Sequence, residues 1–254
     1  MPDSRSPALR LLPPPPASLL NGAALFLDFD GTLAPIADTP DAVVVDDALL
    51  DMLAGLRTRL EGRLAIVSGR SVNTLRALGF ADFTLAGTHG LEIARSGAAI
   101  EAAARLPAVD SSQTAFEAFA ADKPGLLVER KTLSVGLHFR GAPQWGEQAV
   151  ALAEELALGT GLVVQHGKML AELRPSGADK GSAVRALMAT PPMAGGIPLF
   201  IGDDVTDEEG FAAAAALGGC GILVGPQRAT CASWVLEQVG AVRHYLGSGN
   251  VDPA

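Results

Sequence analysis

Short apolar runs alternate along the chain with stretches in which leucine and alanine recur at helical spacing. The runs predict strands at 24–28, 63–68, 84–86, 197–201 and 221–224. The amphipathic stretches predict helices at 46–61, 71–78, 180–188, 207–216 and 228–239. Alternation of this kind is typical of βαβ units around a parallel sheet, so the pattern predicts an α/β core.

The pattern changes in the middle of the chain. A short helix is predicted at 113–121, strand-like alternation covers 128–139, a helix follows at 144–158, and 162–165 with 169–173 suggest an antiparallel pair turning at Gly167. This predicts an α+β module inserted into the α/β core. The predicted organisation is a flexible Pro-rich arm, a core in two parts, the insert, and a disordered tail, at 1–20, 21–105 with 175–246, 106–174 and 247–254.

Composition narrows the possible partners. Hydrophobic residues make up 48% of the chain and the net charge is −9, which argues against nucleic acid. No apolar run approaches the roughly 20 residues that a membrane span needs, and the first residues lack the pattern of a signal peptide. We therefore expect a cytoplasmic protein without membrane contact, and we also expect it to be a monomer. Cys220 and Cys231 match no zinc spacing and are expected to be free thiols.

Two carboxylates follow the first predicted strand. Asp28 and Asp30 are one residue apart, and Gly31 and Thr32 come next. Residues i and i+2 of a strand point to the same side, and two such charges at a buried strand end need a cation or a proton. This favours metal-assisted acid–base or nucleophilic chemistry over the alternative, in which the aspartates only cap a turn.

Polar side chains also follow the other predicted core strands, where ligands bind in open α/β sheets. Two acidic clusters could hold Mg²⁺, while a hydroxyl and a lysine could bind phosphate. Taken singly, each group has a simpler explanation: a turn, a solvated helix residue, or charge at a helix N-terminus. The groups that follow strands are Ser68, Asp203, Asp204 and Asp207, and Lys180 joins them from the start of a predicted helix.

The order of these motifs, from DFDGTL at 28–33 to GDDVTDE at 202–208, resembles the haloacid dehalogenase superfamily of phosphatases. The resemblance implies a Rossmann-like core in which Asp28 is the nucleophile that forms an aspartyl-phosphate and Asp30 is the proton shuttle. It also implies that Thr32, Ser68 and Lys180 bind phosphate or balance charge. Mg²⁺ would be held by Asp28, the Asp30 carbonyl and Asp203, with Asp204 or Asp207 nearby.

The inserted module carries polar residues that could recognise a sugar, although an exposed face of salt bridges would look alike. The segments VERKTLSVGLHFR at 128–140 and GKMLAELRP at 167–175 resemble cap motifs of trehalose-6-phosphate phosphatases. SGR at 68–70 and LAGTHGLE at 85–92 agree with this. The resemblance implies substrate contacts from Arg70, His89, Gly90, Glu129, Lys131, Arg140, Lys168 and Glu172.

The resemblance predicts a Mg²⁺-dependent phosphatase that hydrolyses trehalose 6-phosphate. Other sugar phosphatases, acting on sucrose 6-phosphate, a mannosyl phosphoglycerate or a hexose phosphate, use similar aspartates, as does a phosphomutase. A further alternative is a non-catalytic regulatory domain that binds a sugar phosphate. The intact Asp28 and Asp30 argue against that domain, and the cap motifs argue against the other sugar phosphatases.

Overall fold

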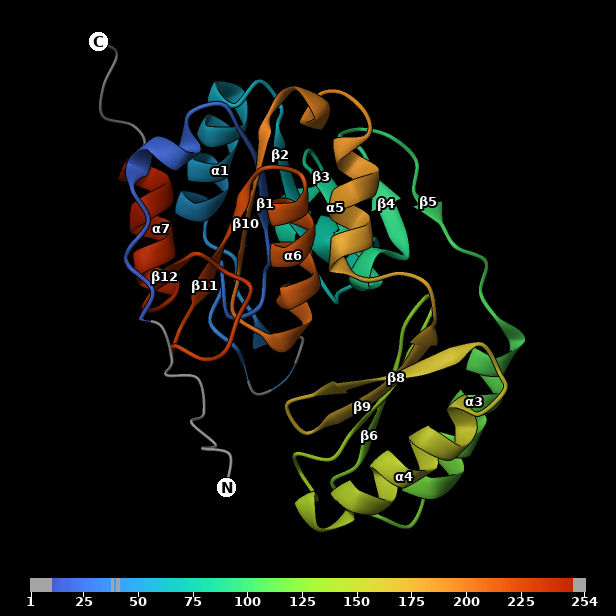
Figure 1. The fold of residues 1–254 in the computed structure, drawn as a ribbon. Coiled ribbons are helices and arrows are strands. Elements are labelled where there is room, and N and C mark those ends of the chain that lie inside the picture. Colours follow the sequence, from blue (N-terminus) through green and yellow to red (C-terminus); the bar gives the residue numbers. More distant parts are fainter. Residues whose placement is uncertain (1–10, 38, 40–41, 249–254) are drawn as a thin grey trace, which may run out of the picture. The chain divides into compact units, whose positions relative to one another are not determined.

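A computed structural model describes residues 11–37, 39 and 42–248. The chain divides into two units, of which the second is Glu101–Ala178 and the first contains the remainder (Figure 1). The predicted insert, 106–174, is slightly shorter than this second unit at both ends. The residues after 174 lie with the insert because Ser176 N donates to Gly161 O at 3.0 Å and Arg174 donates to the carbonyl of Ala178.

The first unit is built on a mostly parallel sheet with the strand order β12-β11-β10-β1-β2-β3-β4. Every neighbouring pair in this order is parallel except β3 with β4. All residues of β1, β2 and β3 are buried, which explains their uninterrupted apolar runs. The strands are β1 (Ala23–Leu27), β2 (Leu64–Val67), β3 (Thr84–Gly87), β4 (Glu92–Ala94), β10 (Ile197–Gly202), β11 (Cys220–Val224) and β12 (Trp234–Leu236).

Helices cover both faces of this sheet, as the α/β prediction requires (Figure 1). On one face, Leu25 and Leu27 pack with Leu53 and Val242 of α1 and α7. On the other, Phe26 packs with residues of α5 and α6. The helices and helical turns are η1 (Ala17–Leu20), α1 (Asp47–Arg59), α2 (Val72–Leu75), η3 (Arg76–Phe80), η4 (Thr88–Gly90), α5 (Lys180–Met188), η6 (Met193–Gly195), η7 (Val205–Asp207), α6 (Glu208–Ala216) and α7 (Val239–Ser248).

The second unit is an antiparallel sheet with two helices, so the prediction of an α+β insert is confirmed. The sheet has the order β6-β7-β9-β8, and its apolar side packs with Phe116 and Ala153 of the helices. The second unit also contains β5 (Glu101–Ala102), which is not part of this sheet. The remaining elements of the unit are α3 (Pro107–Ala120), β6 (Leu127–Arg130), β7 (Val135–His138), η5 (Pro143–Trp145), α4 (Gly146–Ala157), β8 (Leu162–Gly167) and β9 (Leu170–Pro175).

The strand-like alternation over 128–139 corresponds to the hairpin β6–β7, in which the chain reverses where Lys131 N donates to Ser134 O at 3.1 Å. One element prediction is wrong. The final helix does not lie at 228–239: that stretch contains a loop and β12, and the helix is α7 further on. Three consecutive apolar residues, 234–236, suit a strand that pairs with β11, which helical spacing alone does not reveal.

The described part of the Pro-rich arm, residues 11–20, is hydrogen-bonded to the first unit. Val235 N donates to Pro13 O at 3.0 Å, and Tyr245 Oη donates to Pro16 O at 3.1 Å. Residues 1–10 lie outside the described residues, as do 249–254 of the predicted tail; 247 and 248 belong to α7. Within the described segments, no helix has the length and apolar character needed to cross a bilayer.

We predict that Phe211→Ala destabilises the protein because Phe211 is fully buried in α6 and meets Phe200 edge to face at 5.6 Å. The expected loss in the free energy of unfolding is about 3–5 kcal/mol, measured by urea titration. Val205→Ala, at a side chain that is 67% exposed, serves as the control and should change little. A loss below about 1 kcal/mol for Phe211→Ala would contradict this packing.

Candidate active site

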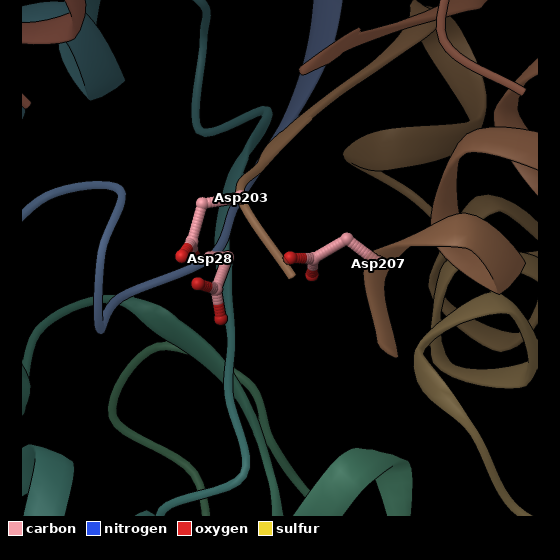
Figure 2. Close-up of side chains that lie close together, drawn as sticks. All are labelled: Asp28, Asp203 and Asp207. Carbon is pink, nitrogen blue, oxygen red and sulfur yellow. The ribbon is translucent and has the colours of Figure 1, made fainter. Parts of the chain in front are cut away.

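Three carboxylates from two neighbouring strand ends converge in the first unit. Asp28 follows β1, Asp203 follows β10, and Asp207 ends the turn η7. One oxygen of each lies within 4.8 Å of those of the others, and Figure 2 shows the three side chains facing one another. Asp28 and Asp207 are buried, so water screens this concentration of negative charge poorly.

Lys180 joins the two buried members of this cluster. Its Nζ donates to Asp28 Oδ1 at 2.7 Å and to Asp207 Oδ1 at 2.6 Å. Lys180 is the first residue of α5, whose N-cap Asp179 accepts from Ser182 N at 2.6 Å in a capping box. The cap therefore fixes the start of the helix, and with it the lysine.

Burial and neighbouring charges both shift the pKa values of Lys180 and Asp28. Burial alone would lower the pKa of Lys180, but the carboxylates of Asp207 and Asp28 outweigh it and raise that pKa. Burial raises the pKa of Asp28, and Lys180 only partly opposes this, because Asp207 and Asp203 raise it further. One ammonium thus faces three carboxylates, and a bound cation would relieve the remaining repulsion.

Two glycines allow the strand-end loops to approach this closely. A Cβ on Gly31, which has φ +89°, would lie 2.2 Å from Asp203 Oδ2. A Cβ on Gly202 would lie 2.3 Å from Asp207 Cγ. Any larger residue at either position would displace a carboxylate of the cluster.

The two predicted phosphate-binding hydroxyls are buried in the same unit. Thr32 Oγ1 donates to Asp203 Oδ1 at 3.4 Å, which places it at the cluster. Ser68 follows β2 and its Oγ accepts from Arg70 N at 3.1 Å. The structure gives no direct contact between Ser68 and the carboxylates, so its role in binding phosphate stays a prediction.

The side chain of Asp30 pairs with Arg70 and is not a member of the carboxylate cluster. Arg70 Nε donates to Asp30 Oδ2 and Nη2 donates to Asp30 Oδ1, each at 2.7 Å. The guanidinium also lies over the ring of Phe29, 5.3 Å from its centroid. Arg70 was predicted to bind substrate, but its bidentate pairing with Asp30 was not predicted from the sequence.

Asp204 and Asp207 were not distinguished by sequence. The described residues place Asp207 in the cluster with Asp28 and Asp203. Asp204 is the N-cap of η7, and its N–H donates to Asp207 Oδ2 at 2.9 Å. The turn geometry of η7 therefore decides which of the two side chains points inward.

His89 and Gly90 lie in a left-handed backbone run in the first unit. Thr88, His89 and Gly90 have φ values of +46°, +55° and +97°. The His89 ring packs so closely on Gly69 that a Cβ there would lie 2.7 Å from Nε2. Sequence missed the adjacent Glu92, whose buried Oε2 accepts from Val72 N at 2.6 Å and ties this run to the loop after Ser68.

The second unit brings several of its predicted residues together. Lys131 Nζ lies 2.7 Å from Glu172 Oε2 and 3.8 Å from Glu129 Oε2. Two further contacts were not predicted: His138 Nε2 lies 2.8 Å from Glu129 Oε2, and Ser134 Oγ donates to Glu172 Oε1 at 2.5 Å. Burial would raise the pKa of Glu129, but His138 and Lys131 lower it below its ordinary value. Arg140 and Lys168 are exposed.

A family model described as trehalose-phosphatase matches residues 26–239, which includes every strand-end motif and the inserted unit. The chain belongs to the trehalose-phosphatase family. The structural neighbours of this family member include phosphatases of the haloacid dehalogenase superfamily, and their likeness shows the same fold. The predicted family and fold class are therefore confirmed.

Individual relatives agree with this membership. The chain is 39% identical over 227 residues to the trehalose-6-phosphate phosphatase of Escherichia coli, covering 88% of this chain and 85% of that protein. It is 40% identical over 210 residues to a probable trehalose-phosphate phosphatase of Sinorhizobium fredii, covering 82% and 79%. A solved trehalose-6-phosphate phosphatase C-terminal domain of C. albicans superimposes with a TM-score of 0.80 at 25% identity, covering 94% and 97%.

We predict that Lys180→Met strongly destabilises the trehalose-phosphatase core, because it leaves Asp28 and Asp207 buried without their shared cation. The expected loss is about 3–5 kcal/mol of unfolding free energy, measured in urea with chelator present. Lys168→Met, at an exposed lysine, is the matched control and should remain within about 0.5 kcal/mol of the parent protein. Similar stability for the two variants would show that the bridge does not balance the cluster.

Proposed function

We propose that this protein is a Mg²⁺-dependent phosphatase that hydrolyses trehalose 6-phosphate to trehalose and phosphate through an aspartyl-phosphate. One observation carries the proposal: in a member of the trehalose-phosphatase family, the buried carboxylate of Asp28 accepts from Lys180 and lies close to two further aspartates. An anionic nucleophile in such a setting needs cations around it before a phosphate dianion can approach.

The donor set suits Mg²⁺, which prefers carboxylate oxygens and water. Asp28 and Asp203 would hold the ion with the carbonyl of Asp30, and Asp207, which pairs with Lys180, would add negative charge close to it. When bound, the ion would neutralise charge on the phosphate and on the nucleophile. One lysine does not neutralise three carboxylates, and the remaining negative charge can balance the two positive charges of Mg²⁺.

The residues themselves can carry out both halves of the reaction. A carboxylate oxygen of Asp28 attacks phosphorus while the bond to the sugar oxygen breaks, and Asp30 gives that oxygen its proton. Asp30 then takes a proton from the water that hydrolyses the aspartyl-phosphate. Because Arg70 holds both Asp30 oxygens, Asp30 must exchange at least one of these hydrogen bonds for the leaving oxygen.

Charge and hydrogen bonding would come from the remaining core groups. Thr32 and Ser68 can donate to phosphate oxygens, and Lys180 offsets negative charge as it builds up at Asp28. His89 and Gly90 would help to bind the substrate from the core. Phosphate release would require no nucleophile other than Asp28 and water.

Specificity for the disaccharide is assigned to the second unit. The cluster of Glu129, Lys131 and Glu172 offers acceptors and a donor within a few ångströms, the arrangement that adjacent sugar hydroxyls require. Arg140 and Lys168 extend this set with two exposed cations that suit a phosphate. We also propose that the protein acts as a monomer in the cytoplasm, without nucleic-acid or membrane partners.

A panel of sugar phosphates tests the proposed function. Phosphate release should be fastest from trehalose 6-phosphate and should disappear when EDTA replaces Mg²⁺. Preference for sucrose 6-phosphate, a mannosyl phosphoglycerate or a hexose phosphate would replace the proposed substrate. Tight binding without phosphate release would identify a non-catalytic regulatory domain, and transfer to a second sugar oxygen would identify a mutase.

Asp28→Asn tests the nucleophile. We expect kcat to fall at least about a thousand-fold, because an amide cannot form the acyl phosphate. Asp122→Asn, in an exposed ion pair of the second unit, is the control and should retain full activity. Rapid turnover by Asp28→Asn would exclude the aspartyl-phosphate route.

Glu129→Gln tests the assignment of sugar recognition. Steady-state kinetics should show a fall in kcat/KM of about ten-fold or more for trehalose 6-phosphate, and little change for p-nitrophenyl phosphate. The reason is that only the disaccharide offers hydroxyls to this carboxylate. Glu117→Gln, at another glutamate of the same unit that pairs with an arginine, is the control. An equal loss on both substrates would contradict a role in specificity.

A further inference from the structure

Arg228 binds the backbone of the loop that carries Asp203 and Asp204. It lies between β11 and β12, beside the loop that follows β10. Its Nη2 donates to Asp204 O at 2.8 Å and, more weakly, to Asp203 O at 3.5 Å. Its Nη1 pairs with Glu208 Oε1. One guanidinium therefore contacts the loop backbone and the start of α6.

Glu208 is fixed on its other oxygen as well. Oε2 accepts from Cys231 N at 2.7 Å and from Thr230 Oγ1 at 3.1 Å. Both side chains of the Arg228–Glu208 pair are largely buried, with 28% and 21% exposed. The loop after β11 and the first turn of α6 are thus joined through a satisfied carboxylate, which makes the arrangement stiff.

We propose that Arg228 is a positioning residue for the cation site, acting through the backbone of Asp203 and Asp204; this rests on the metal dependence proposed above. The carbonyls of the loop face Arg228, while the carboxylates of Asp203 and Asp207 point toward Asp28 (Figure 2). Arg228 donates to the carbonyls of the loop and to Glu208, so it can hold the loop without competing for the carboxylates of the cluster.

The charge of the pair supports this role. Glu208 neutralises Arg228, so this ion pair adds no net charge beside the three carboxylates and Lys180. A lone arginine at this position would repel a divalent cation, whereas a neutral pair leaves the field of the cluster unchanged. The contribution of Arg228 is therefore to hold the loop that carries Asp203 in place. Such positioning matters for Mg²⁺, which binds its ligands in a nearly octahedral arrangement.

The test measures metal affinity directly, on the full chain without substrate. Mn²⁺ binding is titrated by electron paramagnetic resonance for the parent protein, Arg228→Met and Arg228→Lys. Loss of such a supporting contact typically weakens metal binding about 10–100-fold. We expect a loss of this size for Arg228→Met and a smaller one for Arg228→Lys, which keeps one donor. At saturating Mg²⁺, KM for trehalose 6-phosphate should not change.

Arg63→Met is the matched control. Arg63 also donates to a carbonyl, Ala23 O at 3.4 Å, and pairs with a carboxylate, Glu61 at 2.7 Å, but it precedes β2 at the opposite ends of the strands. The Mn²⁺ affinity of Arg63→Met should equal that of the parent protein.

Unchanged Mn²⁺ affinity in Arg228→Met would overturn the inference, and so would an equal loss in Arg63→Met, which would indicate general destabilisation. If the parent protein binds neither Mn²⁺ nor Mg²⁺, the proposed metal dependence fails. That outcome is distinct from a parent that binds metal and an Arg228→Met variant that binds it equally well.

Discussion

The structure of the core unit depends on the bridge from Lys180 to Asp28 and Asp207. Burying two carboxylates costs several kcal/mol each unless a cation accompanies them. The lysine lies 2.7 and 2.6 Å from them and is itself buried, so the three groups stabilise one another and none can be removed alone. The bridge also leaves an excess of negative charge, and this excess would favour the binding of a further cation.

The parallel sheet explains how groups so distant in sequence meet. β1 and β10 are neighbours in register, so Asp28 and Asp203 leave the sheet side by side. Lys180 comes from the capped start of α5, and Asp207 comes from the turn that leads into α6. Each side chain is therefore fixed by the end of a regular element, at the carboxyl ends of the strands, where α/β sheets bind their ligands.

Sequence predicted the strand-end residues because apolar runs that stop at carboxylates give both the element and the position of the side chain. It could not choose between Asp204 and Asp207, since the turn η7 decides which one points inward. The pairing of Arg70 with Asp30 and the hydrogen bonds of Arg228 to the Asp204 backbone join loops that follow neighbouring strands, and no local sequence pattern encodes such contacts. For the same reason β12 was predicted as part of a helix: its pairing with β11 is a long-range contact.

In the mechanism proposed above, a carboxylate oxygen of Asp28 attacks phosphorus and becomes phosphorylated, while the second unit recognises the sugar. Rapid acid quench during turnover of trehalose 6-phosphate, followed by locating the phosphoryl group on the chain, tests this claim most directly. We predict a transient acyl phosphate on Asp28 that forms only with Mg²⁺ present. A phosphoryl group on any other residue, or phosphate release with no labelled enzyme at any time, would contradict it.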